Sequence, residues 1–348
     1  MNPADGHAKN DKTWVALFPG QGSQAIGMGR DFFDAGGVAR EVFEEANEIF
    51  GKDLGKLCFR GPISKLSNTD NLQIAITTVN IAIYEELRAT GWPAPSAALG
   101  HSVGEYSALY AAGVISRSDA LRATRERGRL MQREAKLHSG SMYAIKNTPA
   151  RTIEELIQEL GLADDVIIGN DNGPGQQVVS GATEGVRALV NRLMADGVEC
   201  IKLPVSGAWH SPLMAGASED FARCLNDVRL SAPKIPVITN LSADFATDPG
   251  RIRADMVAHL TGKVRWQDSM RRLLGEEYAT TIEIGPGRVL TRLAAKLAQN
   301  EGVKLAAVGV ESKTDLEQLS AALLEAREAP TSRPENESLN PDRQGARA

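Results

Sequence analysis

Cysteine, histidine, aromatic residues and long apolar runs are all scarce in this sequence. Its three cysteines are scattered over 348 residues and provide neither a metal-ligand spacing nor a disulfide framework, which is typical of a reducing compartment: Cys58, Cys200 and Cys224. No apolar run approaches the roughly 20 residues of a membrane span, and the polar start "MNPADGHAKNDK" lacks the apolar centre of a signal peptide. We therefore expect a cytoplasmic protein that does not enter a membrane.

Excess charge is also missing. The formal net charge is -5, which gives no indication of nucleic acid or a membrane surface as a partner. Hydrophobic residues make up 42% of the chain, enough for a large core or for one domain with an insertion. Residues 1–12 and 329–348 are polar and have little to bury, so we expect both ends to be disordered.

The pattern of apolar residues predicts an α/β fold in two parts. Residues 13–138 and 206–328 alternate strands with helices, which indicates one large domain interrupted by residues 139–205. The interruption has the order strand, helix, strand, strand, helix, strand: "SMYAI", "ARTIEELIQEL", "DVIIGN", "QQVVSG", "TEGVRALVNRLMADG" and "ECIKLPV". This βαββαβ order is typical of a ferredoxin-like unit. We therefore predict a small ferredoxin-like subdomain inserted into a larger α/β domain.

Ser102 stands between a strand pattern and a helix pattern. In "AALGHSVGEYSALYAAGV", residues 97–99 predict the end of a buried strand, and the following apolar residues recur at helical spacing. A serine in so tight a turn, flanked by Gly100 and Gly104, is typical of a nucleophile elbow. The helix N-terminus would also place backbone N–H groups beside the hydroxyl. The alternative is that Ser102 only caps the helix.

A serine nucleophile needs a base that accepts its proton. The chain has five histidines; His7 lies in the polar N-terminal stretch, and the His101 side chain should point away from the neighbouring serine. His138 follows a predicted helix end and His259 lies in a helical stretch, and both are expected to be surface or structural residues. His210 lies in "LPVSGAWHSPLMAG", a constrained loop directly after the predicted subdomain. His210 is therefore the candidate base.

The stretch "FPGQGSQAIGMG" follows the first predicted strand and has two interpretations. Residues 20–25 satisfy G-x-G-x-x-A, the pattern of a dinucleotide-binding turn, which would make the chain a nucleotide-binding module. The acidic residue that usually follows a second strand is missing, however, and Pro19 is unusual at the start of such a turn. In the second interpretation, the glycines bring a backbone N–H group close to a developing oxyanion.

Six motifs occur in one order along the chain: "FPGQGSQ", "GHSVGEYSAL", "RGRLMQ", "NGPGQQVVSG", "GAWHSPLM" and "EIGPGRVL". Together they resemble the malonyl-CoA:acyl carrier protein transacylases of fatty acid and polyketide synthesis, over roughly residues 13–310. The resemblance implies an α/β-hydrolase-like large domain with an inserted ferredoxin-like subdomain. It also implies transfer of a malonyl group from malonyl-CoA to the phosphopantetheine thiol of an acyl carrier protein through a malonyl-serine.

The resemblance assigns roles residue by residue. Ser102 would be the nucleophile and His210 its base, while Gln21 and Val103 would supply the N–H groups of the oxyanion hole. Arg127 would bind the free carboxylate of malonate through two parallel hydrogen bonds, which a lysine cannot form. The carbonyl that orients the histidine comes from the loop that here reads "TGKVRWQD", which places it around Val264 and Arg265.

Trp209 precedes the candidate base at a position where relatives often have Phe or Ser. Its side chain should border the acyl α-carbon and disfavour a branched acyl group, so we expect malonyl first, methylmalonyl behind it and acetyl last. Two further departures from the family pattern are Arg265, where some relatives have glutamine, and Gly173, where serine is commoner. The alternative function is an acyl hydrolase or thioesterase of the same fold, which would need no carboxylate anchor.

The resemblance also implies partners. No metal and no redox cofactor is expected, because CoA and the phosphopantetheine of the carrier are substrates. We expect a monomer that acts with malonyl-CoA and an acyl carrier protein. Since carriers are usually acidic and this chain is acidic overall, the docking face should be locally basic. The candidates lie beside the histidine-orienting loop: Lys263, Arg265, Arg271 and Arg272.

Overall fold

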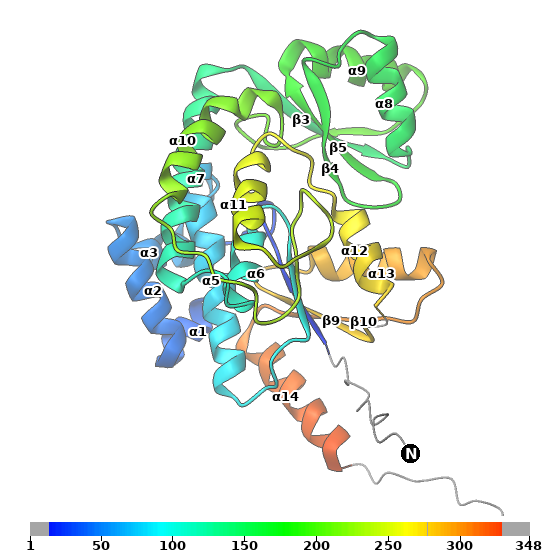
Figure 1. Cartoon of the computed structure of the whole chain (residues 1–348). Helices are drawn as coiled ribbons and strands as arrows, with labels where there is room; N and C mark the ends of the chain where they lie inside the picture. The colour runs from blue at the N-terminus through cyan, green and yellow to red at the C-terminus, as the bar shows by residue number, and fades with distance from the viewer. Residues whose placement is uncertain (1–13, 277, 329–348) are drawn as a thin grey trace, which may run out of the picture.

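The computed structural model describes residues 14–276 and 278–328, so the ends predicted to be disordered lie outside it. The described chain is a mixed α/β fold with two sheets (Figure 1). The strands are β1 Val15–Phe18, β2 Ala97–Gly100, β3 Gly140–Lys146, β4 Val166–Asp171, β5 Gln176–Ala182, β6 Cys200–Lys202, β7 Val237–Ile238, β8 Phe245–Ala246, β9 Thr280–Ile284 and β10 Ala306–Val310.

The helices run between and around these strands. They are α1 Arg30–Ala35, α2 Gly37–Phe50, α3 Leu54–Arg60, α4 Ile63–Leu66, α5 Thr69–Ala89, α6 Gly104–Ala111, α7 Arg117–Leu137, α8 Ala150–Glu159, α9 Thr183–Ala195, the 3₁₀ turn η1 Pro212–Met214, α10 Ala215–Leu225, α11 Pro249–Ala258, α12 Trp266–Leu274, α13 Val289–Asn300 and α14 Lys313–Glu328. No helix within residues 14–276 and 278–328 is both long and apolar enough to cross a membrane.

The larger sheet has the strand order β10-β9-β1-β2-β7-β8, in which only β8 pairs antiparallel with its neighbour. Successive residues of a strand point to opposite faces, and here both faces are buried. Ala16 and Phe18 of β1 belong to the core that contains residues of α5, α6 and α7, whereas Val15 and Leu17 belong to the core that contains residues of α12 and α13. Helices therefore cover both sides of a largely parallel sheet, which leaves its strand ends for a site.

The smaller sheet spans residues 140–202 and has the antiparallel order β4-β5-β3-β6. Figure 1 shows it at the top of the view with α8 and α9 beside it. Ile145 and Val179 face these two helices, while Met142, Ala144 and Val178 of the opposite face join the core of the larger part. This second face therefore lies against the strand ends of the larger sheet.

Two sets of hydrogen bonds join the smaller sheet to the rest of the molecule. The N–H of Val264 donates to the carbonyl of Gly169 (2.8 Å), and the N–H of Asp171 donates to the carbonyl of Val264 (2.9 Å). The hydroxyl of Ser180 donates to the carbonyl of Trp209 (2.6 Å). The smaller sheet thus supports both the segment before α12 and the loop that carries His210.

Candidate active site

Ser102 lies in the tight turn between β2 and α6, where its φ is 51°, a left-handed value that is uncommon for serine. A Cβ on Gly100 would lie 2.1 Å from the carbonyl oxygen of Gly104, and a Cβ on Gly104 would lie 2.1 Å from that of Phe18. Backbone atoms cannot yield to such overlaps, so both positions require glycine. The turn places the Ser102 hydroxyl beside the N-terminus of α6.

His210 reaches Ser102 from the loop before η1. Its Nε2 lies 2.8 Å from Ser102 Oγ, and its Nδ1 lies 2.8 Å from the carbonyl oxygen of His259 and 3.2 Å from that of Gly262. A carbonyl can only accept, so Nδ1 carries the proton and Nε2 has its lone pair toward the hydroxyl. Burial, followed by the charge of Arg127, lowers the pKa of His210 to about 3, against the two carbonyls that raise it. The imidazole is therefore neutral near pH 7.

The predicted loop "TGKVRWQD" supplies one of the two orienting carbonyls, that of Gly262, but the other comes from His259 before the loop, and neither comes from Val264 or Arg265. The carbonyl of Val264 accepts from the smaller sheet instead, and the Arg265 side chain binds Asp268 and the carbonyl of Ser242. The acceptors are His259, which caps the C-terminus of α11, and Gly262. The last carbonyls of a helix have no partner within it, which makes them available to the imidazole.

His259 was predicted to be a surface or structural residue, yet it contacts the base directly. It is buried, and its ring centroid lies 4.6 Å from that of His210. Nothing in the local sequence distinguishes it from any other histidine near a helix end. Its contact with His210 depends on how α11 packs, and no sequence motif indicates that packing.

The loop after β1 lies directly against the serine turn. A Cβ on Gly20 would be 2.3 Å from the carbonyl oxygen of His101. The N–H of His101 in turn donates to the carbonyl of Phe18. The first helix after this loop begins only at Arg30, so these glycines do not open a helix as a dinucleotide-binding turn does. In residues 14–276 and 278–328, the backbone N–H groups of Gln21 and Val103 have no hydrogen-bond acceptor. The geometry therefore favours the oxyanion interpretation of the loop.

Arg127 is fully buried in α7. Its Nη1 donates to Gln73 Oε1 (2.7 Å), but its Nε and Nη2 have no acceptor among the described residues. The guanidinium carbon lies 5.9 Å from the ring centroid of Tyr106, and burial lowers the pKa of Arg127 while Tyr106 and Glu105 oppose that shift. A guanidinium stays charged in proteins, so the N–H groups of Nε and Nη2 are charged donors that can bind an anion.

Gln73, which accepts from this guanidinium, also lines the cavity that contains Ser102. A cavity of about 70 Å³ is lined by Gln73, Gln21, Ser102, Trp209 and His210, among others. A second cavity of about 250 Å³ adjoins it, shares its lining residues Gln21, His101, Asn170, Leu203 and Val205, and extends to Val289, Leu290 and Leu293 of α13. The two cavities together form a path to the hydroxyl. The side chain of Trp209 is 5% exposed and borders the inner end of this path.

Comparison with known proteins identifies the family. The acyl transferase domain matches residues 13–335. The malonyl CoA-acyl carrier protein transacylase of Bacillus subtilis (strain 168) is 37% identical over 294 residues, covering 84% of this chain and 92% of that protein. The chain belongs to the acyl transferase family. The same-named protein of Escherichia coli K12 is 35% identical to this acyltransferase over 282 residues, covering 81% of this chain and 91% of the other.

Solved structures agree with this acyltransferase over most of its length. An acyl carrier protein S-malonyltransferase from Vibrio cholerae has a TM-score of 0.84 at 33% identity, covering 88% of this chain and 99% of the other. A malonyl-transacylase solved in complex with a type II PKS acyl-carrier protein has a TM-score of 0.83 at 34% identity, covering 88% and 98%.

The four cations predicted to form a docking face are all paired in this acyltransferase. Lys263 binds Glu154 (2.7 Å), and Arg265 binds Asp268 (2.8 Å). Arg271 binds Glu301 (2.7 Å), and Arg272 binds both Asp244 (2.9 Å) and Glu276 (2.6 Å). Each positive charge therefore lies beside a carboxylate of the same chain, and the docking face stays a prediction.

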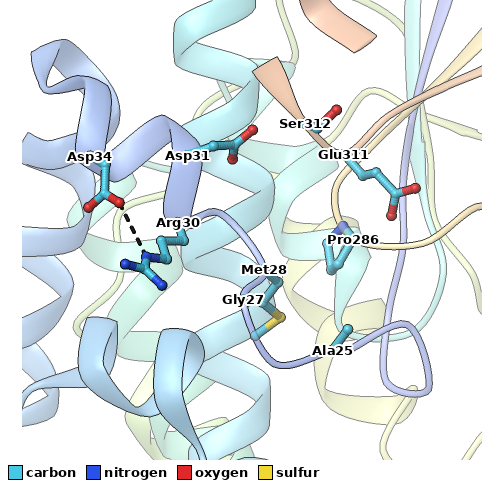
Figure 2. A pocket seen from close by; sticks show the side chains of 9 residues that line it. All are labelled: Ala25, Gly27, Met28, Arg30, Asp31, Asp34, Pro286, Glu311 and Ser312. Carbon is cyan, nitrogen blue, oxygen red and sulfur yellow. Dashed lines mark hydrogen bonds and ion pairs between the residues drawn. The ribbon is translucent and has the colours of Figure 1, made fainter. Parts of the chain in front are cut away.

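Figure 2 shows a separate cavity of this acyltransferase, of about 510 Å³, beside the N-terminus of α14. It is lined by Arg30, Asp34 and Glu311, among others, and Arg30 pairs with Asp34 (3.2 Å). It shares no lining residue with the cavities around Ser102. Within the part of the chain that the structure describes, no group of three His, Cys, Asp or Glu residues is arranged to hold a metal ion.

Proposed function

We propose that this acyltransferase transfers a malonyl group from malonyl-CoA to the phosphopantetheine thiol of an acyl carrier protein. The proposal rests on two features that occur close together. A serine bonded to a neutral histidine (2.8 Å) lines a cavity together with Gln73, and Gln73 accepts from a buried guanidinium whose Nε and Nη2 have no acceptor among the described residues. The first supports acyl transfer, and the second supports an acyl group that ends in a carboxylate.

In the first half-reaction, Ser102 Oγ attacks the thioester carbon while its proton moves to His210 Nε2. The Gln21 and Val103 N–H groups stabilise the oxyanion of the tetrahedral intermediate. The carbon–sulfur bond breaks, and the departing CoA sulfur takes the proton from His210. In the second half-reaction, the carrier thiol gives its proton to His210 Nε2 while its sulfur attacks the acyl carbon of the malonyl-serine. The bond between that carbon and Ser102 Oγ then breaks, and Oγ takes the proton from His210. Neither step needs a metal or redox cofactor.

The finer description of the fold belongs to the same proposal. The mainly parallel larger sheet with a serine turn after β2 supports an α/β-hydrolase-like domain. The order β4-β5-β3-β6 with α8 and α9 on one face supports a ferredoxin-like insertion. The cytoplasmic location and monomeric state expected from the sequence stay predictions.

Intact-mass spectrometry tests the assignment. After incubation with malonyl-CoA, the enzyme should carry one malonyl group, and Ser102→Ala should carry none. Ser107→Ala, on the helix α6 that follows the Ser102 turn, is the control and should be acylated like the wild type. Adding holo-carrier should move the group to the carrier. An adduct on Ser102→Ala would overturn the assignment, and rapid loss of the adduct to water without an acceptor would indicate the acyl hydrolase instead.

Trp209 sets the acyl choice in this proposal, because its side chain borders the cavity that contains Ser102. Trp209→Ser should raise methylmalonyl relative to malonyl transfer by roughly 10–200-fold, the usual effect of one methyl group in a tight pocket. Paired CoA thioesters in competition measure the ratio. An unchanged ratio would mean that Trp209 serves only to pack the histidine loop.

A further inference from the structure

Asn240 follows β7 at the same sheet edge as the serine turn, and its side chain spans that turn. Its Oδ1 accepts the N–H of Ser102 (2.8 Å), and its Nδ2 donates to the carbonyl of Gly100 (2.6 Å). One planar amide thus binds the backbone on both sides of His101. A serine with a positive φ is held in an uncommon conformation, and such a conformation persists where its surroundings enforce it.

Asn240 is itself fixed by backbone bonds. Its N–H donates to Oε2 of Glu105 (2.6 Å), and its carbonyl accepts the N–H of Arg265 (3.0 Å). Asn240 and Glu105 are each 1% exposed. The amide therefore reaches the turn from a rigid base, without water to compete for its hydrogen bonds.

These contacts bear on the reaction in two ways. The Ser102 N–H is already occupied, so it is not available for an oxyanion, and the Val103 N–H remains. The same contacts set the direction of the Ser102 side chain, whose Oγ lies 2.8 Å from His210. We propose that Asn240 is a positioning residue that holds the Ser102 turn in its reactive geometry. This proposal rests on the proposed function only in taking Ser102 as the nucleophile.

The chemistry of the two bonds distinguishes an amide from its nearest replacements. Alanine would remove both bonds and leave a buried N–H and a buried carbonyl unpaired. A carboxylate of the same shape would still accept from Ser102 but would repel the Gly100 carbonyl. Once protonated, that carboxyl could both accept and donate, as the amide does. Asn240→Asp should therefore recover with falling pH, whereas Asn240→Ala cannot.

The test measures serine reactivity apart from substrate binding. Methanesulfonyl fluoride forms a bond between Ser102 Oγ and sulfur, the sulfur–fluorine bond breaks, and the serine proton leaves with fluoride. We expect Asn240→Ala to slow this labelling by on the order of 10²-fold. Its kcat for malonyl transfer should fall while KM stays within about twofold, because the lost contacts act on the nucleophile. Asn47→Ala, which removes a side chain that accepts from Leu54 and Gly55 far from the turn, should label like the wild type.

The pH arm compares Asn240→Asp with Asn240→Ala at each pH between 8 and 5. Both variants keep the charged groups around the turn, so their titration cancels in the ratio: Glu105 from α6, Arg127 from α7, His210, Asp255 from α11 and Arg265 before α12. The ratio of labelling rates should rise at least about tenfold as pH falls, because protonation restores the missing donor.

The proposal is overturned if Asn240→Ala labels at the wild-type rate, if the pH ratio stays flat, or if Asn47→Ala is slowed equally. It is also overturned if both Asn240 variants fail to fold, since Asn240 would then serve the fold alone. A wild-type enzyme that labels on a residue other than Ser102 would contradict the proposed function instead, which keeps the two failures distinct.

Discussion

Arg127 is a buried charge whose hydrogen bonds within the described chain are incomplete. Its buried Nε and Nη2 have no acceptor among the described residues, and only Gln73 binds the guanidinium. Such a charge destabilises the fold until an anion pairs with it. An acyl group without a carboxylate would leave that cost in place, so we expect Arg127 to favour malonyl over acetyl.

Arg127→Ala should therefore lower kcat/KM for malonyl-CoA by roughly 10²–10⁴-fold, corresponding to two charged hydrogen bonds, and leave acetyl-CoA little changed. Arg127→Lys should recover only part, because an ammonium cannot form two parallel bonds. Competition between the two CoA thioesters measures the preference, with the exposed Arg129→Ala as control. If malonyl keeps its preference in Arg127→Ala, another group binds the carboxylate.

The buried carboxyl of Glu105 should make the stability of the fold depend on pH. Burial raises the pKa of this carboxyl from 4.5 to about 7, although the Asn240 N–H opposes the shift. Between these values the folded enzyme holds a proton that the unfolded chain has lost, so the stability from this group is complete below pH 4.5 and is lost as pH rises through 7.

Glu105→Gln should remove this loss, which is on the order of 3 kcal/mol between pH 5 and 8. Urea unfolding at both pH values measures it as the change in free energy of unfolding, relative to the wild type. The depressed pKa of His210 acts in the opposite direction but is present in both proteins, so it cancels. Glu154→Gln, at an exposed ion pair, is the control. Parallel pH profiles for Glu105→Gln and wild type would contradict the assigned pKa.

At the scale of elements, the packing of α5 against α7 brings Gln73 to Arg127, and Gln73 lines the cavity that contains Ser102. Gly128 allows this pair to pack closely: a Cβ there would lie 2.5 Å from the carbonyl oxygen of Thr69 on α5. Helix propensity alone would favour alanine by about 1 kcal/mol, but overlap with backbone costs about 1–3 kcal/mol. The packing term outweighs the propensity.

Gly128→Ala should therefore destabilise the fold by about 1–2 kcal/mol and raise KM for malonyl-CoA, as α7 moves away from α5. Thermal unfolding and steady-state kinetics measure the two effects. Gly250→Ala in α11, where a Cβ meets only the Asp248 carboxylate at 3.2 Å, should be neutral or stabilising. A more stable Gly128→Ala would mean that the helices can separate without cost.

Helices with a clear apolar period and turns that require glycine could be predicted from the sequence. The apolar spacing predicts helices over about 72–90 and 119–136, which the structure has at Thr69–Ala89 and Arg117–Leu137, and the Ser102 turn followed from its flanking glycines. The strand predicted over residues 199–205 is shorter, Cys200–Lys202, because Pro204 cannot donate to a sheet. The two-residue strand Phe245–Ala246 is too short to show alternation. Asn240 and His259 were missed because their contacts arise from packing between distant segments.

At the scale of the whole molecule, the site is assembled between the two sheets. The larger sheet carries Ser102, while the smaller sheet lies over the cavity and supports the loop of the base through the Ser180–Trp209 bond (2.6 Å). A surface ion pair, Lys263–Glu154, joins the same two parts. We therefore expect the buried Ser180–Trp209 bond to contribute more to stability and to the acylation rate than the exposed Lys263–Glu154 ion pair.

Ser180→Ala leaves the Trp209 carbonyl buried without its donor, which should cost about 1–3 kcal/mol of stability. Because His210 is the next residue, its imidazole should lose alignment, and malonylation of Ser102 should slow by roughly tenfold, since small displacements at a reacting centre have large effects. Lys263→Ala should change stability by less than about 1 kcal/mol and leave the rate unchanged. Urea unfolding and single-turnover malonylation measure both. If Ser180→Ala loses stability but keeps its rate, the larger sheet alone aligns His210 through the carbonyls of His259 and Gly262, and the smaller sheet only covers the site.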